Sequence, residues 1–166
     1  MKYYSLDLFR STPIALNVYM YSAKCIMLAD DDSDDRFLFE EALREVCNVS
    51  KLIVACDGLE LIKKLEETVK PFPDVIFIDI NMPYLNGLEC LSKIRLDKNL
   101  QSIPVIMLST TQNKATVESA YKLGANYYIH KPSSFAVLKK MIEKVYTVLS
   151  SPLPLLTPKK DFLLTL

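Results

Sequence analysis

Three acidic residues follow two short apolar runs of the chain. Asp30 and Asp31 come directly after CIMLA, and Asp79 comes directly after VIFI. Carboxylates that converge within several ångströms repel each other by roughly 4 kcal/mol per close pair at an effective dielectric constant of about 20, so a cation must compensate them. Magnesium suits a set of ligands that are all oxygens, and it commonly shares an oxygen of a substrate phosphate.

A hydroxyl and an amine stand at the ends of two further apolar runs. Ser109 closes VIMLS, and Lys131 comes directly after YYIH. Lys131 can neutralise one oxygen of a phosphoryl group while Ser109 hydrogen-bonds another, which is the charge stabilisation that phosphoryl transfer needs. Acidic runs also occur in solvated loops, and we favour this explanation for Asp34 and Asp35, which would stabilise a helix N-terminus. Solvation explains poorly why five suitable residues end four separate apolar runs.

The apolar runs indicate the elements that must position these residues. From about residue 24 to 150, short apolar runs alternate with longer segments whose apolar residues recur at helical spacing. This alternation predicts five βα units and an α/β fold, with a doubly wound parallel sheet covered by helices on both faces. Ligands of such sheets bind beyond the carboxyl ends of the strands, so the polar residues above belong to one site. The expected strands are 25–29, 51–55, 75–78, 105–109 and 127–130.

Local signals predict some of the backbone detail. Ser33 or Asp34 is the expected N-cap of the first helix, because both types accept hydrogen bonds from free backbone N–H groups. Gly124 is expected to end the fourth helix. Gly87, in the loop region after Asp79, is expected to have a positive φ.

The composition is that of a soluble globular protein. The chain has 166 residues, of which 50% are hydrophobic and 24% charged, and its formal net charge is zero. No apolar run approaches the roughly 18 residues that span a bilayer, and no signal peptide stands out. Four scattered cysteines without a C-x-x-C pair fit buried thiols in a reducing compartment. We therefore expect a cytoplasmic protein that binds neither membrane nor nucleic acid.

The sequence divides into three parts. Residues 1–23 form an N-terminal extension, residues 24–150 the domain, and residues 151–166 a tail rich in Pro and Leu. Three prolines between positions 152 and 158 argue against a helix in the tail. The apolar content of both ends suggests docking on the domain or on a second subunit. An unstructured tail, or a true translation start near Met20, remains an equal alternative.

Four segments resemble the receiver domain of two-component response regulators. They are CIMLADDDSDD, VIFIDINMPYLNGLE, PVIMLSTT and LGANYYIHKPSS. The resemblance extends over about residues 24–149 and includes every signature position. It implies a flavodoxin-like sheet of five strands in the order 2-1-3-4-5 with five helices.

The resemblance implies a role for each acidic residue. Asp79 would be the phosphoacceptor, which takes a phosphoryl group from the phosphohistidine of a sensor histidine kinase or phosphotransfer protein. Asp31 and Asp79 would bind Mg²⁺ directly, Asn81 would offer its backbone carbonyl, and Asp30 would act mainly through water. The run of three Asp leaves this register open by one residue, so Asp32 is the alternative ligand.

The resemblance also implies roles at the other strand ends. Ser109 and Lys131 match the family's hydroxyl and its lysine, which precedes a cis proline, here Pro132. Tyr128 matches the aromatic switch, which turns inward when the phosphoryl group draws Ser109 toward it. Tyr128 could also be an ordinary half-buried aromatic residue.

These inferences predict a stand-alone, single-domain response regulator in a phosphorelay. Only residues 151–166 follow the last expected helix, too few for a DNA-binding domain, so we expect signalling through an unidentified protein target. The protein would catalyse only its own phosphorylation and dephosphorylation. The fourth helix, the fifth strand and the fifth helix form the expected partner or homodimer surface, with four candidate residues: Tyr121, Lys122, Tyr127 and Lys139.

Two alternatives stay open. One is a pseudo-receiver that works only as a phosphorylation-independent docking module, although the complete set of site residues argues against it. The other is a phosphohydrolase of the haloacid-dehalogenase type, which also uses a strand-end Asp and Mg²⁺. That motif needs a second acid two residues after the nucleophile, and Asn81 stands there.

Overall fold

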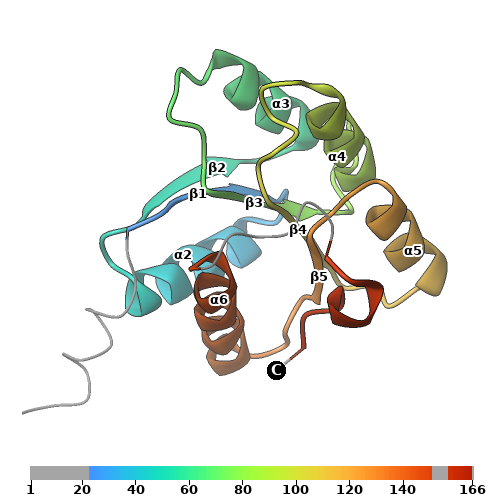
Figure 1. Cartoon of the computed structure of the whole chain (residues 1–166). Coiled ribbons are helices and arrows are strands. Elements are labelled where there is room, and N and C mark those ends of the chain that lie inside the picture. The colour runs from blue at the N-terminus through green and yellow to red at the C-terminus, as the bar shows by residue number, and fades with distance from the viewer. Residues whose placement is uncertain (1–22, 151–156, 166) are drawn as a thin grey trace, which may run out of the picture.

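A five-stranded parallel sheet forms the centre of the molecule, with helices on both faces (Figure 1). The computed structural model describes residues 23–150 and 157–165. The strand order is β2-β1-β3-β4-β5, so the predicted doubly wound, flavodoxin-like topology is confirmed. The strands are β1 (Cys25–Ala29), β2 (Lys51–Ala55), β3 (Val75–Asp79), β4 (Val105–Ser109) and β5 (Tyr127–His130).

Five α-helices cover the sheet. Buried residues of α3, α4 and α5 pack with one face of the strands, and those of α2 and α6 pack with the other. The three central strands are buried along almost their whole length, which explains why their sequences are continuously apolar rather than alternating. The helices are α2 (Ser33–Val46), α3 (Gly58–Glu67), α4 (Gly87–Leu96), α5 (Lys114–Lys122) and α6 (Phe135–Leu149), and η1 (Lys159–Asp161) is a short 3₁₀ helix.

The cap of α2 differs from the prediction. Asp32, rather than Ser33 or Asp34, is the N-cap, and its carboxylate accepts hydrogen bonds from the N–H groups of Asp34 at 2.8 Å and Asp35 at 3.3 Å. Both residue types suit a cap, so local sequence could not decide between adjacent positions. The helix starts one residue after Asp32, and the side chain of Asp32 is thereby occupied.

Glycine is needed at two positions for different structural reasons. Gly124 has a φ of 88° and directly follows the C-cap residue of α5, as predicted. Gly87 was expected at positive φ, and this is wrong: it is the first residue of α4, with an ordinary backbone. A Cβ on Gly87 would lie 2.3 Å from the carbonyl oxygen of Asp79, so glycine is needed because two backbones approach closely.

The end of the chain packs on the domain. Phe162 and Leu164 are buried, and residue 163 pairs with Tyr128 at the free edge of β5. Of the alternatives for the tail, docking on the domain therefore holds for residues 157–165. The expectations for residues 1–22 and 151–156 lie outside the described residues. None of the helices within the described ranges is long and apolar enough to cross a lipid bilayer.

We predict that Gly87→Ala destabilises the protein by about 1–3 kcal/mol, because the added methyl group would force apart the backbones of α4 and the end of β3. The helix propensity of Ala, about 1 kcal/mol better than that of Gly, offsets only part of this cost. Urea denaturation measures the change. Leu96→Ala on the same helix is the control, since Leu96 is 81% exposed and its truncation should change the free energy of unfolding by less than about 0.5 kcal/mol. Equal effects of the two substitutions would contradict the close-packing explanation.

Candidate functional site

The carboxyl ends of four neighbouring strands bring the candidate residues together. Asp79 and Ser109 are the last residues of β3 and β4, while Asp30 and Lys131 directly follow β1 and β5. Ladder-like hydrogen bonds continue past the strand ends: Asp30 N–H donates to the carbonyl of Ala55 at 3.2 Å and Lys131 N–H to that of Ser109 at 2.8 Å. The sheet itself therefore fixes the backbone from which each side chain projects.

Three carboxylates form a cluster that can hold a cation. Asp30, Asp31 and Asp79 each offer an oxygen, and these oxygens lie within 4.8 Å of one another. Asp30 and Asp79 are 2% and 5% exposed, whereas Asp31 is open to solvent. An oxygen-only set that is partly buried and partly open fits a hard divalent ion that keeps some of its waters. Asp32 is outside this cluster because its carboxylate caps α2.

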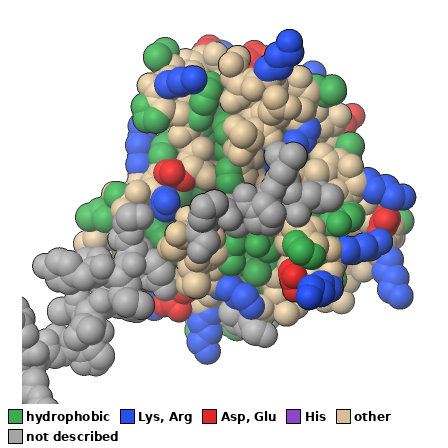
Figure 2. All heavy atoms as spheres, viewed as in Figure 1, with side chains coloured by type: hydrophobic (Ala, Val, Ile, Leu, Met, Phe, Trp, Pro, Cys, Tyr) green, Lys and Arg blue, Asp and Glu red, His purple; other side chains and the backbone are tan. Residues whose placement is uncertain are grey.

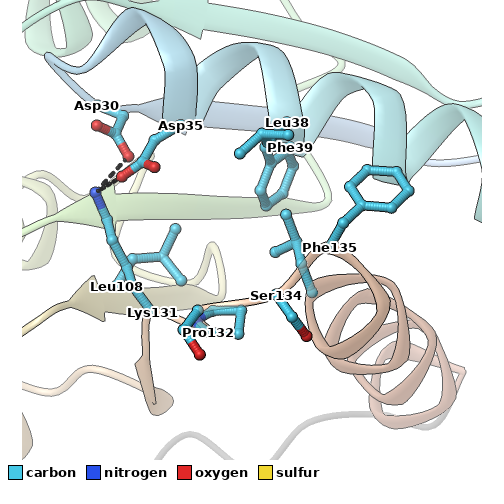
Figure 3. Close-up of a pocket in the computed structure, with 11 residues that line it drawn as sticks. Asp30, Asp35, Leu38, Phe39, Leu108, Lys131, Pro132, Ser134 and Phe135 are labelled. Carbon is cyan, nitrogen blue, oxygen red and sulfur yellow. Dashed lines mark hydrogen bonds and ion pairs between the residues drawn. The ribbon is translucent and has the colours of Figure 1, made fainter.

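Lys131 is surrounded by carboxylates, as Figure 3 shows for two of them. Its Nζ lies 2.8 Å from Asp30 Oδ2, 2.8 Å from Asp35 Oδ2 and 3.3 Å from Asp79 Oδ2. The ammonium group thus joins the end of β5 to the ends of β1 and β3 and to the first turn of α2. The acidic groups outnumber it, so the cluster keeps an excess of negative charge that favours a further cation.

Sequence reasoning missed Asp35, which we had assigned only to the helix N-terminus. Asp35 is the third residue of α2 and turns its carboxylate back to Lys131. Its position in the first turn of a helix that begins close to Asp30 in the sequence was the only signal that could have found it. The same strand–helix junction therefore supplies two of the carboxylates that contact Lys131.

The protonation equilibria follow from this arrangement. Burial raises the pKa of the Asp30 carboxyl, and its ion pair with Lys131 offsets only part of this effect. Burial works against the charge of Lys131, but the hydrogen bonds to Asp30 and Asp35 outweigh it and raise the pKa of Lys131. Lys131 therefore stays cationic at neutral pH, while the ionised form of Asp30 is held at an energetic cost.

Ser109, the last residue of β4, and Tyr128, in the neighbouring strand β5, lie beside each other. Ser109 is fully buried, and its Oγ accepts a hydrogen bond from Thr111 N–H at 3.1 Å. The Tyr128 ring is 1% exposed, and its hydroxyl donates to the carbonyl of Thr111 at 2.9 Å. Burial raises the pKa of Tyr128, and a hydrogen bond with Ser109 works in the opposite direction. The tyrosine is therefore turned fully inward and is not the half-buried residue of the alternative explanation.

Two details of the loops differ from or extend the expectations. Asn81 is exposed in the loop after β3, two residues beyond Asp79, which leaves it accessible at the mouth of the site. The bond between Lys131 and Pro132 was expected to be cis, and this is wrong, because the one cis bond in residues 23–150 and 157–165 is Lys70–Pro71. The trans form is the default for X–Pro bonds, and a sequence contains no local signal for the exception.

A small cavity opens next to this cluster, between α2 and the start of α6 (Figure 3). It has a volume of about 80 Å³, with Asp30, Asp35 and Lys131 at one end and the apolar side chains of Leu38 and Phe135 further along. The site thus has a charged centre and an apolar flank.

Comparison with known proteins decides the family. The model of the response regulator receiver domain matches residues 26–143. The chain belongs to this family. Response regulator Rcp1 of Synechocystis is 32% identical over 126 residues, which are 74% of this chain and 86% of Rcp1. Chemotaxis protein CheY1 of Helicobacter pylori is 35% identical over 120 residues, which are 72% of this chain and 94% of CheY1.

Solved receiver structures share the fold. The phosphorylated cyanobacterial phytochrome response regulator RcpA has a TM-score of 0.71 at 30% identity, covering 78% of this chain and 96% of that one. The Mn²⁺-bound form of response regulator Rcp1 has a TM-score of 0.67 at 30% identity, covering 79% and 99%. The protein is therefore a receiver homologous to single-domain response regulators of two-component signalling.

The raised pKa of Asp30 predicts a pH-dependent stability difference. In the unfolded chain the Asp30 carboxyl has an ordinary pKa of about 3.9, and in the folded protein its pKa is higher. As the pH rises from the first value to the second, ionisation of Asp30 lowers the free energy of unfolding. Above the folded pKa this loss of stability is complete. With EDTA present, Asp30→Asn should therefore raise the free energy of unfolding at pH 7, and the gain should disappear near pH 3. Urea denaturation at both pH values measures it. Asp34→Asn, an exposed residue of the same acidic run, should give no such gain, and a gain from both variants at pH 7 would point to general charge repulsion instead.

Proposed function

We propose that this receiver accepts a phosphoryl group on Asp79 from the phosphohistidine of a sensor histidine kinase or phosphotransfer protein. The observation that supports this assignment is the position of the Asp79 carboxylate, which is buried at the end of β3, 3.3 Å from Lys131 Nζ and within the acidic cluster. Among the three clustered carboxylates, Asp79 alone extends from a central strand with Ser109 of the adjacent strand beside it. The acceptor thus has a cation and a hydroxyl within one short stretch of sheet edge.

Asp79, Lys131 and Ser109 would each have a different role in the phosphoryl transfer. One carboxylate oxygen of Asp79 attacks phosphorus, the bond from phosphorus to the donor imidazole nitrogen breaks, and an acyl phosphate and a free histidine result. Lys131 exchanges part of its contact with Asp30 and Asp79 for a phosphoryl oxygen. Ser109 gives up its place beside Tyr128 to donate a hydrogen bond to another phosphoryl oxygen.

We propose Mg²⁺ as the cofactor of this step. Asp31 and Asp79 would hold it directly, the Asn81 backbone carbonyl would add a ligand, and Asp30 would act mainly through water. The fit is supported by the three-carboxylate cluster and by the Mn²⁺-bound form of its relative Rcp1. When bound, the ion neutralises charge on the transferring phosphoryl group.

The surface next to the site suits a protein partner. Phe37 and Leu38 of α2 are 62% and 41% exposed, and Leu38 lines the cavity beside Lys131. Exposed apolar side chains beside a reaction centre offer a docking area for the protein that donates the phosphoryl group. The formal net charge of zero gives no general attraction to nucleic acid, and on the face seen in Figure 2 the visible Lys and Arg side chains lie in several separate places.

The output surface would be formed by α5, β5 and α6, either for an unidentified protein target or for a second copy of the chain. Of its candidate residues, Lys122 is exposed, and Lys139 pairs with Glu45 at 2.5 Å. Tyr127 is buried, and Tyr121 is half-buried against the C-terminal segment. Contact by Tyr127 is therefore less favoured than contact by the lysines. A cytoplasmic location fits this role.

We predict that acetyl phosphate adds a single phosphoryl group to the protein in the presence of Mg²⁺, and that Asp79→Asn removes this reaction. Intact-mass spectrometry measures the adduct, which should be labile to base as an acyl phosphate. Asp57→Asn is a control, because Asp57 is the N-cap of α3 and is not one of the clustered carboxylates, and Asn can replace it as a cap. An adduct that persists in Asp79→Asn would assign the acceptor elsewhere. Bound Mg²⁺ with neither an adduct nor release of inorganic phosphate would favour the phosphorylation-independent docking module. Release of many equivalents of inorganic phosphate from acetyl phosphate, with no adduct that accumulates and with the release lost in Asp79→Asn, would favour a phosphohydrolase.

A second prediction separates the two possible registers of the acidic run. Asp31→Asn should weaken Mg²⁺ binding about tenfold or more, because a direct carboxylate ligand is lost. Asp32→Asn should bind Mg²⁺ nearly normally and stay folded, since Asn is as good an N-cap as Asp. Isothermal titration calorimetry with MgCl₂ measures both variants. The opposite order of affinities would assign the metal to Asp32.

A further inference from the structure

The C-terminal segment, residues 157–165, is joined to the same residue that we assign to the switch. Tyr128 N–H donates to the carbonyl of Phe162 at 2.9 Å, and Leu164 N–H donates to the carbonyl of Tyr128 at 2.9 Å. Leu163 is thereby the parallel bridge partner of Tyr128 on the free edge of β5. Both backbone groups of Tyr128 are therefore held from the outside of the sheet by this segment.

Side chains of the segment pack on both faces of the sheet at its β5 edge. Phe162 is 2% exposed and packs edge-on against the Tyr121 ring of α5, with centroids 5.0 Å apart, and its centroid lies 6.4 Å from that of Tyr128. Leu164 is buried in the apolar cluster of the opposite face, with α2 and α6. Leu163, between them, points outward and is 52% exposed.

Polar contacts tie the segment to both neighbouring helices. Lys159 Nζ lies 2.6 Å from Glu118 Oε2 of α5 and 5.7 Å from the centroid of the Tyr121 ring. Lys144 of α6 hydrogen-bonds the carbonyl of Thr165. In Figure 1 the segment accordingly runs beside β5, next to α5. It covers part of the surface on which an output partner would dock.

The position of Phe162 restricts the movement of Tyr128. The two rings belong to the same apolar cluster on one face of the sheet, together with Tyr121. The Tyr128 ring points inward, and its hydroxyl donates a hydrogen bond to the carbonyl of Thr111. For the ring to swing out toward α5 and solvent, it would have to displace the phenyl ring that fills the space between α5 and β5.

We propose that the C-terminal segment acts as an intramolecular clamp on β5, in which Phe162 is a positioning residue that holds the Tyr128 ring inward. Docking of the segment on the domain is thereby coupled to phosphorylation of Asp79. This inference rests on the proposed function. In the switch assigned to Tyr128, the inward ring accompanies phosphorylation of Asp79, so a segment that holds the ring inward would also favour phosphorylation. Thermodynamic linkage then requires reciprocity: if docking favours phosphorylation, phosphorylation must strengthen docking by the same factor.

A purely structural role is the competing explanation, since any apolar strap would also cover the edge of the sheet. Three variants of the full-length protein separate the two. Phe162→Ala removes the phenyl ring, and Phe162→Leu keeps much of its apolar volume if the first variant folds poorly. Leu163→Ala is the matched control, because it alters the adjacent outward side chain and leaves the backbone hydrogen bonds of the segment in place.

The first measurement is the position of the Tyr128 ring, by nuclear Overhauser contacts between its ring protons and Thr111. We expect Phe162→Ala to lose these contacts and Leu163→Ala to keep them, with Phe162→Leu between the two. Amide exchange of Leu164 should accelerate about tenfold or more in Phe162→Ala only, because a buried phenyl ring no longer holds the segment. A Tyr128 ring that stays inward while the Leu164 amide has lost its protection would overturn the proposal.

The second measurement tests the coupling through the acceptor. With acetyl phosphate and Mg²⁺, the fraction of phosphorylated protein should fall several-fold in Phe162→Ala and stay unchanged in Leu163→Ala, and phosphorylation of the wild type should slow Leu164 amide exchange. Equal phosphorylation of all variants would refute the coupling while leaving the phosphorelay function intact. If the wild type takes no phosphoryl group, the proposed function and the coupling both fail, and the ring position alone still decides whether Phe162 positions Tyr128.

Discussion

The arrangement of the site depends on the repulsion between carboxylates at the carboxyl edge of the sheet and on the Lys131 ammonium group that compensates them. A parallel sheet brings the ends of β1, β3, β4 and β5 to one edge, so their polar residues cannot avoid one another. Lys131 Nζ contacts carboxylates from three different elements at 2.8–3.3 Å. The cluster still has more carboxylates than cations, and this imbalance favours binding of a further cation at this edge.

The surrounding structure serves to keep this edge rigid. Gly87 allows the start of α4 to approach the backbone of Asp79 more closely than any side chain would permit. Asp32 begins α2 directly beside the cluster and thereby brings Asp35 back to Lys131. Hydrogen bonds beyond the strand ends hold Asp30 and Lys131 to the sheet. Backbone contacts thus fix the position of Asp79, while burial within the cluster raises the pKa of Asp30.

The free edge of β5 links this reaction centre to the rest of the surface. Ser109, Thr111 and Tyr128 form a continuous set of hydrogen bonds from the site toward α5. In this chain the set does not end at solvent, because Phe162 packs against Tyr121 and Tyr128 where the surface would otherwise be open. A segment of the chain itself therefore covers part of the proposed output surface, and this segment lies outside residues 26–143, which the family model matches.

The sheet order followed only from the resemblance to receiver domains. Short apolar runs and motif spacing predicted the five strands and placed the acidic, hydroxyl and lysine residues at the strand ends. These features depend on neighbours in the sequence or on the single rule that parallel strands share an edge. The role of Asp35, the absence of Asp32 from the cluster, the reason for Gly87 and the docking of Phe162 depend on atoms that are distant along the chain. Local patterns contain no record of such contacts, so the three-dimensional packing alone decided them.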